Sequence, residues 1–168
     1  LEKPLRTFSQ VKELRAVDPE IHLHTVAQIL KGLNAELKGE LPILGFAGSP
    51  MSLAFFLIAG SSPNRKIKEV LAFVEEQPAI TEALLELLTE MTVDYINFQT
   101  ASGAHAVQLF ESFADVIPSE LYKKFVQPTH EKIFSSLSPN AHSILFTKES
   151  QHLDLMLQSG ASVLSVGS

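Results

Sequence analysis

The stretch from Leu41 to Pro50 reads LPILGFAGSP and decides the fold class of this chain. Its first part, up to Phe46, is short and apolar on both faces, which is typical of a strand buried in a parallel sheet. Gly48 and Ser49 begin a turn, and Pro50 suits the first position of a helix, where its missing N–H leaves nothing unpaired. The stretch therefore predicts a strand that turns directly into a helix.

The rest of the chain alternates between the same two periods. Asp18 is a candidate N-cap with Pro19 behind it, and Gly39 is a candidate C-cap. Further short apolar runs predict strands over 106–110, 144–146 and 163–166. Helical spacing of the apolar residues predicts helices over 18–37, 67–74, 80–95 after an interruption at Pro78, 119–137 with a kink at Pro128, and 150–159.

This order of elements predicts a parallel sheet with helices packed outside it. In such folds the chemistry lies at the carboxyl ends of the strands. The segments to consider are therefore 46–50, 110–115, 147–149 and 167–168.

Composition excludes several classes of protein. The 168 residues are 45% hydrophobic and 19% charged, unlike a disordered chain or a coiled coil. The absence of cysteine excludes disulfides, thiolate catalysis and cysteine-ligated zinc, and is compatible with an intracellular address. The longest apolar run, Leu53 to Ala59, is too short to span a bilayer. A net charge of −6 without a basic cluster argues against nucleic-acid binding.

A few polar side chains at the expected strand ends are candidates for chemistry. Ser112 follows the second strand and is either a substrate hydrogen-bond donor or structural. Lys148 follows the third and pairs either with a carboxylate substrate or with Glu149. The Gly-rich turn 45–50 either presents N–H groups to an anion or simply needs glycine for its geometry. Surface or packing roles are expected for all histidines, namely His22, His24, His105, His130, His142 and His152.

Three motifs resemble one family. Residues 42–50, PILGFAGSP, followed by Ser52-Leu53-Ala54, look like the uroporphyrinogen decarboxylase signature PLIGFAGAPWTLA. Residues 101–112, ASGAHAVQLFES, and 143–148, SILFTK, are similar to two later segments of that family. The resemblance covers essentially all of the chain.

The resemblance implies a (β/α)8 TIM barrel, of which residues 1–168 match about strands 3 to 6, with the N- and C-terminal parts absent. It also implies a cytoplasmic homodimer, when full-length, that uses neither cofactor nor metal. The family removes the four acetate carboxyl groups of uroporphyrinogen III, giving coproporphyrinogen III in haem biosynthesis. Its catalytic Asp and its late His lie outside this chain, so the isolated chain is expected to be inactive.

Carried over residue by residue, the resemblance places Phe46 in the wall of the porphyrinogen pocket and Ser112 beside the substrate. Phe56 stands where the family has a Tyr beside the reacting acetate, so a hydroxyl donor is lost. With Lys148 these are the expected substrate-binding residues. Ala59 replaces a usual Glu, and Gly167-Ser168 replaces a usual Asp-Trp.

Two alternatives stay open. The Phe56, Ala59 and Gly167 departures would suit a degenerate, non-catalytic homologue. The other is a relative in the cobalamin-dependent methyltransferase branch, whose zinc-ligating His and Cys would fall at residues 146–148, where this chain has Phe, Thr and Lys.

Overall fold

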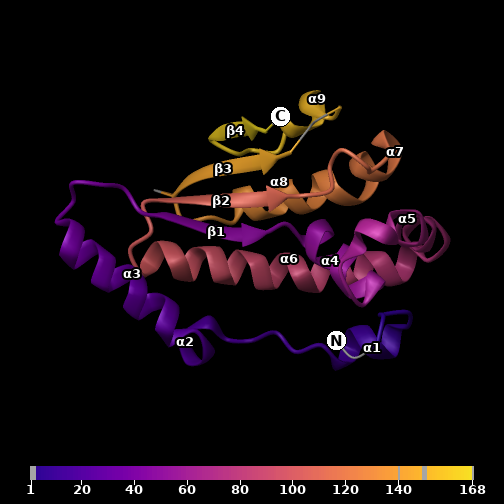
Figure 1. The fold of residues 1–168 in the computed structure, drawn as a ribbon, viewed down its shortest axis with the longest axis horizontal. Helices are drawn as coiled ribbons and strands as arrows, with labels where there is room; N and C mark the ends of the chain where they lie inside the picture. Colours follow the sequence, from indigo (N-terminus) through magenta and orange to yellow (C-terminus); the bar gives the residue numbers. More distant parts are fainter. Residues whose placement is uncertain (1–2, 140, 149–150, 168) are drawn as a thin grey trace.

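Four parallel strands form one sheet with helices on one side of it. The computed structural model describes residues 3–139, 141–148 and 151–167. Each strand pairs with the next in the chain, so the order across the sheet is β1-β2-β3-β4. Figure 1 shows the arrowheads of the strands pointing the same way. The strands are β1 (Leu44–Gly48), β2 (Ala106–Glu111), β3 (His142–Thr147) and β4 (Val163–Val166). Neighbouring parallel strands with helical crossovers are the expected arrangement for part of a (β/α)8 barrel.

Helices fill the connections between these strands. The long helix α6 follows α4 and α5 in the crossover from β1 to β2 (Figure 1). The helices are α1 (Phe8–Glu13), α2 (Pro19–His22), α3 (His24–Leu37), α4 (Pro50–Ala59), α5 (Ile67–Glu76), α6 (Pro78–Ala101), α7 (Ser119–Leu121), α8 (Gln127–Ser135) and α9 (Leu153–Met156), with a 3-10 turn at Pro63–Arg65 and a π-helical stretch at Tyr122–Val126.

The expected helix over 18–37 is wrong in detail, because it is two helices. Asp18 is the N-cap of α2 as predicted, but Leu23 leaves helical geometry with φ −116° and ψ 27°. Leu23 lines a cavity beside β1, so tertiary contacts, which local spacing does not report, accompany the break. At the far end, Lys38 rather than Gly39 is the C-cap, with a left-handed φ of 48°.

Several other helix and strand boundaries in the structure also differ from those predicted from the sequence. The helix expected over 150–159 is limited to the four residues of α9, and residue 150 lies outside the described part. The first strand runs over 44–48 rather than 41–46. Pro128 removes the N–H that would bond one turn back, and the π-helical stretch immediately before it accommodates this loss in place of a simple kink. Residues 8–13 form a helix that the apolar pattern did not predict.

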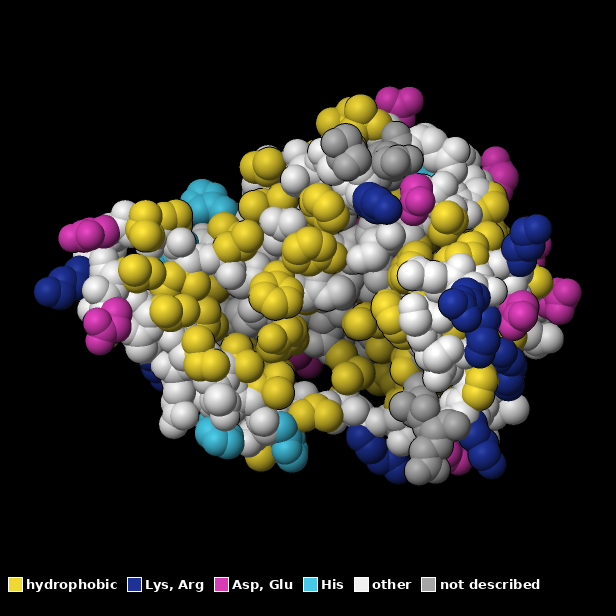
Figure 2. Space-filling view, viewed as in Figure 1, with side chains coloured by type: hydrophobic (Ala, Val, Ile, Leu, Met, Phe, Trp, Pro, Cys, Tyr) yellow, Lys and Arg dark blue, Asp and Glu magenta, His cyan; other side chains and the backbone are white. Residues whose placement is uncertain are grey.

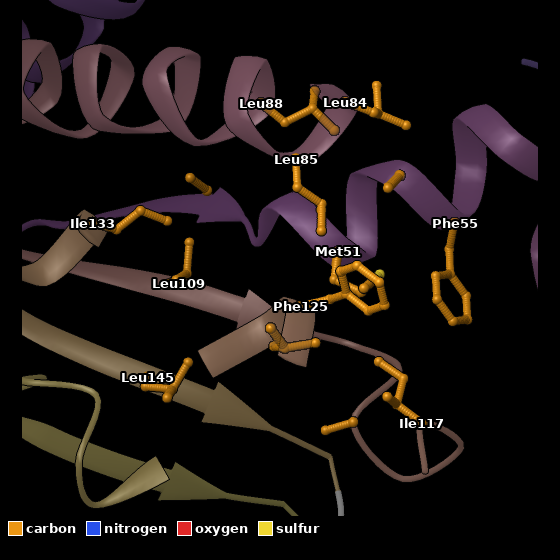
Figure 3. Close-up of a cluster of buried hydrophobic side chains, with 14 of the residues drawn as sticks. Met51, Phe55, Leu84, Leu85, Leu88, Leu109, Ile117, Phe125, Ile133 and Leu145 are labelled. Carbon is orange, nitrogen blue, oxygen red and sulfur yellow. The ribbon is translucent and has the colours of Figure 1, made fainter. Parts of the chain in front are cut away.

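The core lies between the sheet and its helices. Leu109 of β2 and Leu145 of β3 are almost fully buried and point toward the helical layer (Figure 3). There they meet Met51 and Phe55 of α4 and leucines of α6 such as Leu84. At about 1.5–3 kcal/mol for each large apolar side chain buried, this layer is the main source of stability.

The opposite face of the sheet carries no helix among the described residues. We define the open face by the strand residues that alternate with the buried set, namely Leu44, Phe46, Gly48, Ala106, Gln108, Phe110, His142, Ile144, Phe146, Val163 and Ser165. Phe46 is 63% exposed and Val163 is 53% exposed. Figure 2 shows hydrophobic side chains gathered over the middle of the molecule, where the strands lie in Figure 1. In a closed barrel this face would line the interior.

The free edge of β1 is partly covered by a side chain. Gln99 of α6 donates from Nε2 to the carbonyl of Phe46 and accepts from its N–H, both at 3.0 Å. The amide thus replaces the partners that a further strand would supply to an edge. A Cβ on Gly45 would lie 2.7 Å from Gln99 Oε1, so glycine is required for this close approach. In the described part of the chain, no helix combines the length and the apolar character needed to cross a membrane.

Candidate active site

The carboxyl ends of the strands meet at one edge of the sheet, as the alternation of strands and helices predicted. Gly48 of β1 pairs with Phe110 of β2, which pairs with Phe146 of β3. Ser112 and Lys148 directly follow the last residues of β2 and β3. Residues from distant parts of the sequence therefore surround one common region.

Phe46 belongs to a row of aromatic rings along the open face. Its ring meets Phe110 edge-on with 6.1 Å between centroids, and Phe110 meets Phe146 with 5.1 Å between centroids. Edge-to-face and tilted pairs at these distances are favourable for aromatic rings. The row forms an apolar wall that leads to the carboxyl ends of the strands.

Phe56 lies on α4, beside the segment that follows Ser112. It is 48% exposed, and its ring lies 5.9 Å from that of Phe113. The ring of Phe55, the neighbouring residue, stacks on the ring of Phe113 with 4.9 Å between their centroids. The helix that follows β1 and the loop that follows β2 are thus joined through aromatic rings, and Phe56 presents no hydroxyl there.

Ser112 and Lys148 are both exposed. The backbone N–H of Ser112 donates to Ser52 Oγ at 2.8 Å, which fixes the chain where it leaves β2. No described carboxylate lies within ion-pair distance of Lys148, and Glu149 lies outside the described residues. The backbone N–H of Gly167 donates to the carbonyl of Thr147, which holds the ends of β3 and β4 together.

A buried polar cluster that the sequence did not single out lies just behind these residues. Glu111, which is fully buried, accepts hydrogen bonds from the hydroxyls of Ser49 and of Ser52, the latter at 2.6 Å. His130 Nε2 of α8 lies 3.4 Å from Glu111 Oε2. One signal for this cluster was available, because Glu111 is in phase with the buried apolar residues Val107 and Leu109.

His130 connects the cluster to an aromatic pair. Tyr122 Oη lies 3.4 Å from His130 Nδ1, and the Tyr122 ring stacks on His152 with 4.3 Å between centroids. Burial raises the pKa of Tyr122 well above its ordinary value, and the nearby charge of Glu111 raises it further. The phenol therefore stays neutral and is available as a hydrogen-bond donor.

The six histidines, for which surface or packing roles were expected, differ in burial, and His130 contacts the Glu111 carboxylate in the polar cluster. His130 and His152 are buried, and the other four are exposed. His105 Nδ1 accepts from the N–H of Ile43 at 3.0 Å, which extends the pairing at the start of β1. In the ranges that the structure describes, no three histidine or acidic side chains gather closely enough to hold a metal ion.

Two cavities lie near the sheet but suit a large anionic ligand poorly. An apolar cavity of about 250 Å³ beside the end of β1, lined by Leu53 among others, is smaller than most ligand pockets. A cleft of about 640 Å³ is lined by Asp18, Glu20 and Asp94, together with residues near the amino ends of β2 and β3. Carboxylates at that cleft would repel an anion. The strand ends and the open face are therefore the better candidate.

Comparison with known proteins agrees with the motifs at these strand ends. A family model described as uroporphyrinogen decarboxylase (URO-D) matches residues 1–168. The chain belongs to the uroporphyrinogen decarboxylase family. It is 36% identical to the uroporphyrinogen decarboxylase of Cellvibrio japonicus, over 98% of this chain and 48% of that protein. It is 35% identical to the one from Streptomyces avermitilis, over 99% of this chain and 46% of that protein. The chain spans about half the length of these relatives.

A solved structure supports the fold assigned to this family member. A methyltransferase from Methanosarcina mazei superimposes with a TM-score of 0.73, over 84% of this chain and 40% of that one. The two sequences are 21% identical, so the likeness concerns the fold alone. Together with family membership, it confirms the expectation of an α/β chain built as part of a TIM barrel.

Proposed function

We propose that this chain forms the central part of a uroporphyrinogen decarboxylase barrel and carries part of its substrate-binding wall. The proposed reaction removes the four acetate carboxyl groups of uroporphyrinogen III and gives coproporphyrinogen III. The observation that carries the proposal is the aromatic row of Phe46, Phe110 and Phe146, which ends at Ser112 and Lys148 in a chain matched throughout by the family.

The chemistry of these residues suits a tetrapyrrole that bears carboxylates. Aromatic rings offer a broad apolar surface to pyrrole rings. The Lys148 ammonium can form an ion pair with a substrate carboxylate, and the Ser112 hydroxyl can donate a hydrogen bond to a second polar group of the substrate. We propose that Phe46, Phe56, Ser112 and Lys148 contact the substrate, in a cytoplasmic enzyme that needs no cofactor and is a homodimer when full-length.

Binding and turnover are separate questions for this chain. None of its three arginines, Arg6, Arg15 and Arg65, directly follows a strand in the sequence. A substrate with several carboxylates needs more cations than Lys148 supplies. We therefore expect the 168-residue chain to bind uroporphyrin, the stable oxidised form of the substrate skeleton, but to release no coproporphyrinogen from uroporphyrinogen.

The binding test is a fluorescence titration with uroporphyrin. Lys148→Met should raise the Kd about tenfold and reduce its dependence on salt, because one ion pair is lost. Lys31→Met, which removes an exposed lysine on α3, is the matched control and should leave the Kd unchanged. Equal effects of the two substitutions, or no binding by the parent chain, would contradict the proposal.

A second candidate is a non-catalytic homologue, favoured by the bare ring of Phe56. In a longer version that contains the rest of the barrel, Phe56→Tyr should increase turnover severalfold if the missing hydroxyl limits decarboxylation. Decarboxylation that starts only with the substitution would favour the non-catalytic candidate. Full activity of the parent with no gain from Phe56→Tyr would show that the pocket functions without this hydroxyl.

A further inference from the structure

The buried carboxylate of Glu111 faces the helices and not the open face. It follows Val107 and Leu109 in the buried alternation of β2, and its own exposed fraction is 0%. An ionised carboxylate at such a place requires hydrogen-bond donors around it. The Ser49 and Ser52 hydroxyls and His130 provide them.

Ser52 connects this carboxylate to the candidate binding residue Ser112. Its hydroxyl donates to Glu111 Oε1 at 2.6 Å and accepts from the N–H of Ser112 at 2.8 Å. A hydroxyl has one proton, so committing it to Glu111 turns a lone pair toward the Ser112 amide. The path of the backbone at Ser112, where the chain leaves β2, is therefore linked to the Glu111 carboxylate through two consecutive hydrogen bonds.

The far side of the cluster is arranged to keep Glu111 in place. With a proton on Nε2, His130 donates toward Glu111, and its Nδ1 is then free to accept from Tyr122 Oη at 3.4 Å. The raised pKa of Tyr122 keeps that phenolic proton in place. Tyr122 belongs to the π-helical stretch and His130 to α8, so two elements brace the carboxylate from behind.

We infer that Glu111 and Ser52 are positioning residues, which act through the backbone of Ser112 to hold its hydroxyl at the mouth of the candidate site. This inference rests on the proposed function, since Ser112 is there a substrate contact. Neither Glu111 nor Ser52 needs to touch the substrate. Their role is to fix where β2 ends and the loop toward Phe113 begins.

The test compares Ser52→Ala with a matched control, Ser143→Ala. Both serines are 4% exposed, but Ser143 lies at the start of β3, at the opposite end of the sheet, and bonds to Ser162. Ser52→Ala should speed hydrogen exchange of the Ser112 amide about tenfold, which equals about 1.4 kcal/mol, the order of one hydrogen bond. Ser143→Ala should leave that exchange rate unchanged.

A double-mutant cycle separates positioning from general weakening. Ser52→Ala and Ser112→Ala should each raise the Kd for uroporphyrin, and the double variant should bind no more weakly than Ser112→Ala alone. Additive losses would overturn the inference, because Ser52 would then act independently of Ser112. Ser52→Thr retains the hydroxyl and should restore both slow exchange and affinity, and a folded Ser52→Thr chain that restores neither would also contradict it.

The two hypotheses fail in different ways. If the parent chain does not bind uroporphyrin, the proposed function is wrong, while the exchange rate of the Ser112 amide still reports on Ser52. If Ser52→Ala leaves that exchange rate unchanged, the positioning role is wrong even where the parent binds the porphyrin.

Discussion

Tyr122 illustrates how the environment of one residue changes its chemistry. It is one of the largest fully buried side chains, and the pKa of its phenol is raised by burial and then by Glu111. Between the ordinary value near 10 and the raised one, the unfolded chain loses the proton while the folded chain keeps it. Stability from this group is therefore full below about pH 10 and decreases as the pH rises above it.

Replacing Tyr122 by Phe should make this decrease disappear. Near neutral pH, Tyr122→Phe should cost about 1 kcal/mol through the lost contact with His130. Above about pH 10 the difference from the parent should narrow by up to about 1.4 kcal/mol per pH unit. Urea unfolding of both proteins from pH 8 to 11 measures this difference in free energy of unfolding. The control is Phe125→Leu, a substitution at a nearby buried position that neither removes nor adds an ionisable group. Its difference from the parent in free energy of unfolding should stay constant over this pH range.

The residue scale also shows what a sequence can miss. Ser112 and Lys148 were recognised because each follows an apolar run, and Phe46 because of the family resemblance; the structure has the first two directly after β2 and β3 and Phe46 on the open face. Glu111 was passed over beside Ser112, because its donors come from α4 and α8, remote in sequence. Only the fold brings these donors together.

At the scale of single elements, α4 depends on the glycine that ends it. Gly60 is its C-cap with φ 68°, and a Cβ there would lie 2.8 Å from Pro4 Cγ. The segment before α1 packs at this point, where the N–H of Leu5 donates to the carbonyl of Leu57 at 2.9 Å. The end of α4 and the N-terminal segment are therefore stabilised together.

Two glycine substitutions test this dependence. Gly60→Ala should destabilise the chain by at least about 1–2 kcal/mol, because alanine is strained at positive φ and meets Pro4. Gly32→Ala, in the exposed part of α3 with open space around it, should instead stabilise it by about 0.5–1 kcal/mol. Thermal and urea unfolding measure both. If both substitutions changed the free energy of unfolding in the same direction, this account of α4 would be contradicted.

For the whole molecule, the open face is the main departure from an ordinary globular surface. Leu44, Phe46 and Val163 on this face are 48%, 63% and 53% exposed, and edge strands with such faces favour association. Gln99 limits this at β1 by occupying the backbone of Phe46.

We therefore expect the 168-residue chain, in the absence of a porphyrin, to self-associate through the open face. Light scattering should give a mass above the 18.4 kDa of one chain, increasing with concentration. Phe46→Ser with Val163→Ser should return the mass to that of one chain. Leu157→Ser removes a side chain of comparable exposure (67%) outside the open face and should leave association unchanged. A parent chain of 18.4 kDa at all concentrations would disprove this expectation.

By itself the sequence determined the fold class, the four strands, the main helices and the family. These follow from local signals, namely apolar periodicity, prolines at helix starts and a motif that spans one strand and its turn. The break at Leu23 and the gathering of hydrogen-bond donors around Glu111 were decided by the tertiary structure. Both involve residues far apart in the chain. The alternation of β2 marks Glu111 as buried, but no periodic pattern in the sequence identifies its partners.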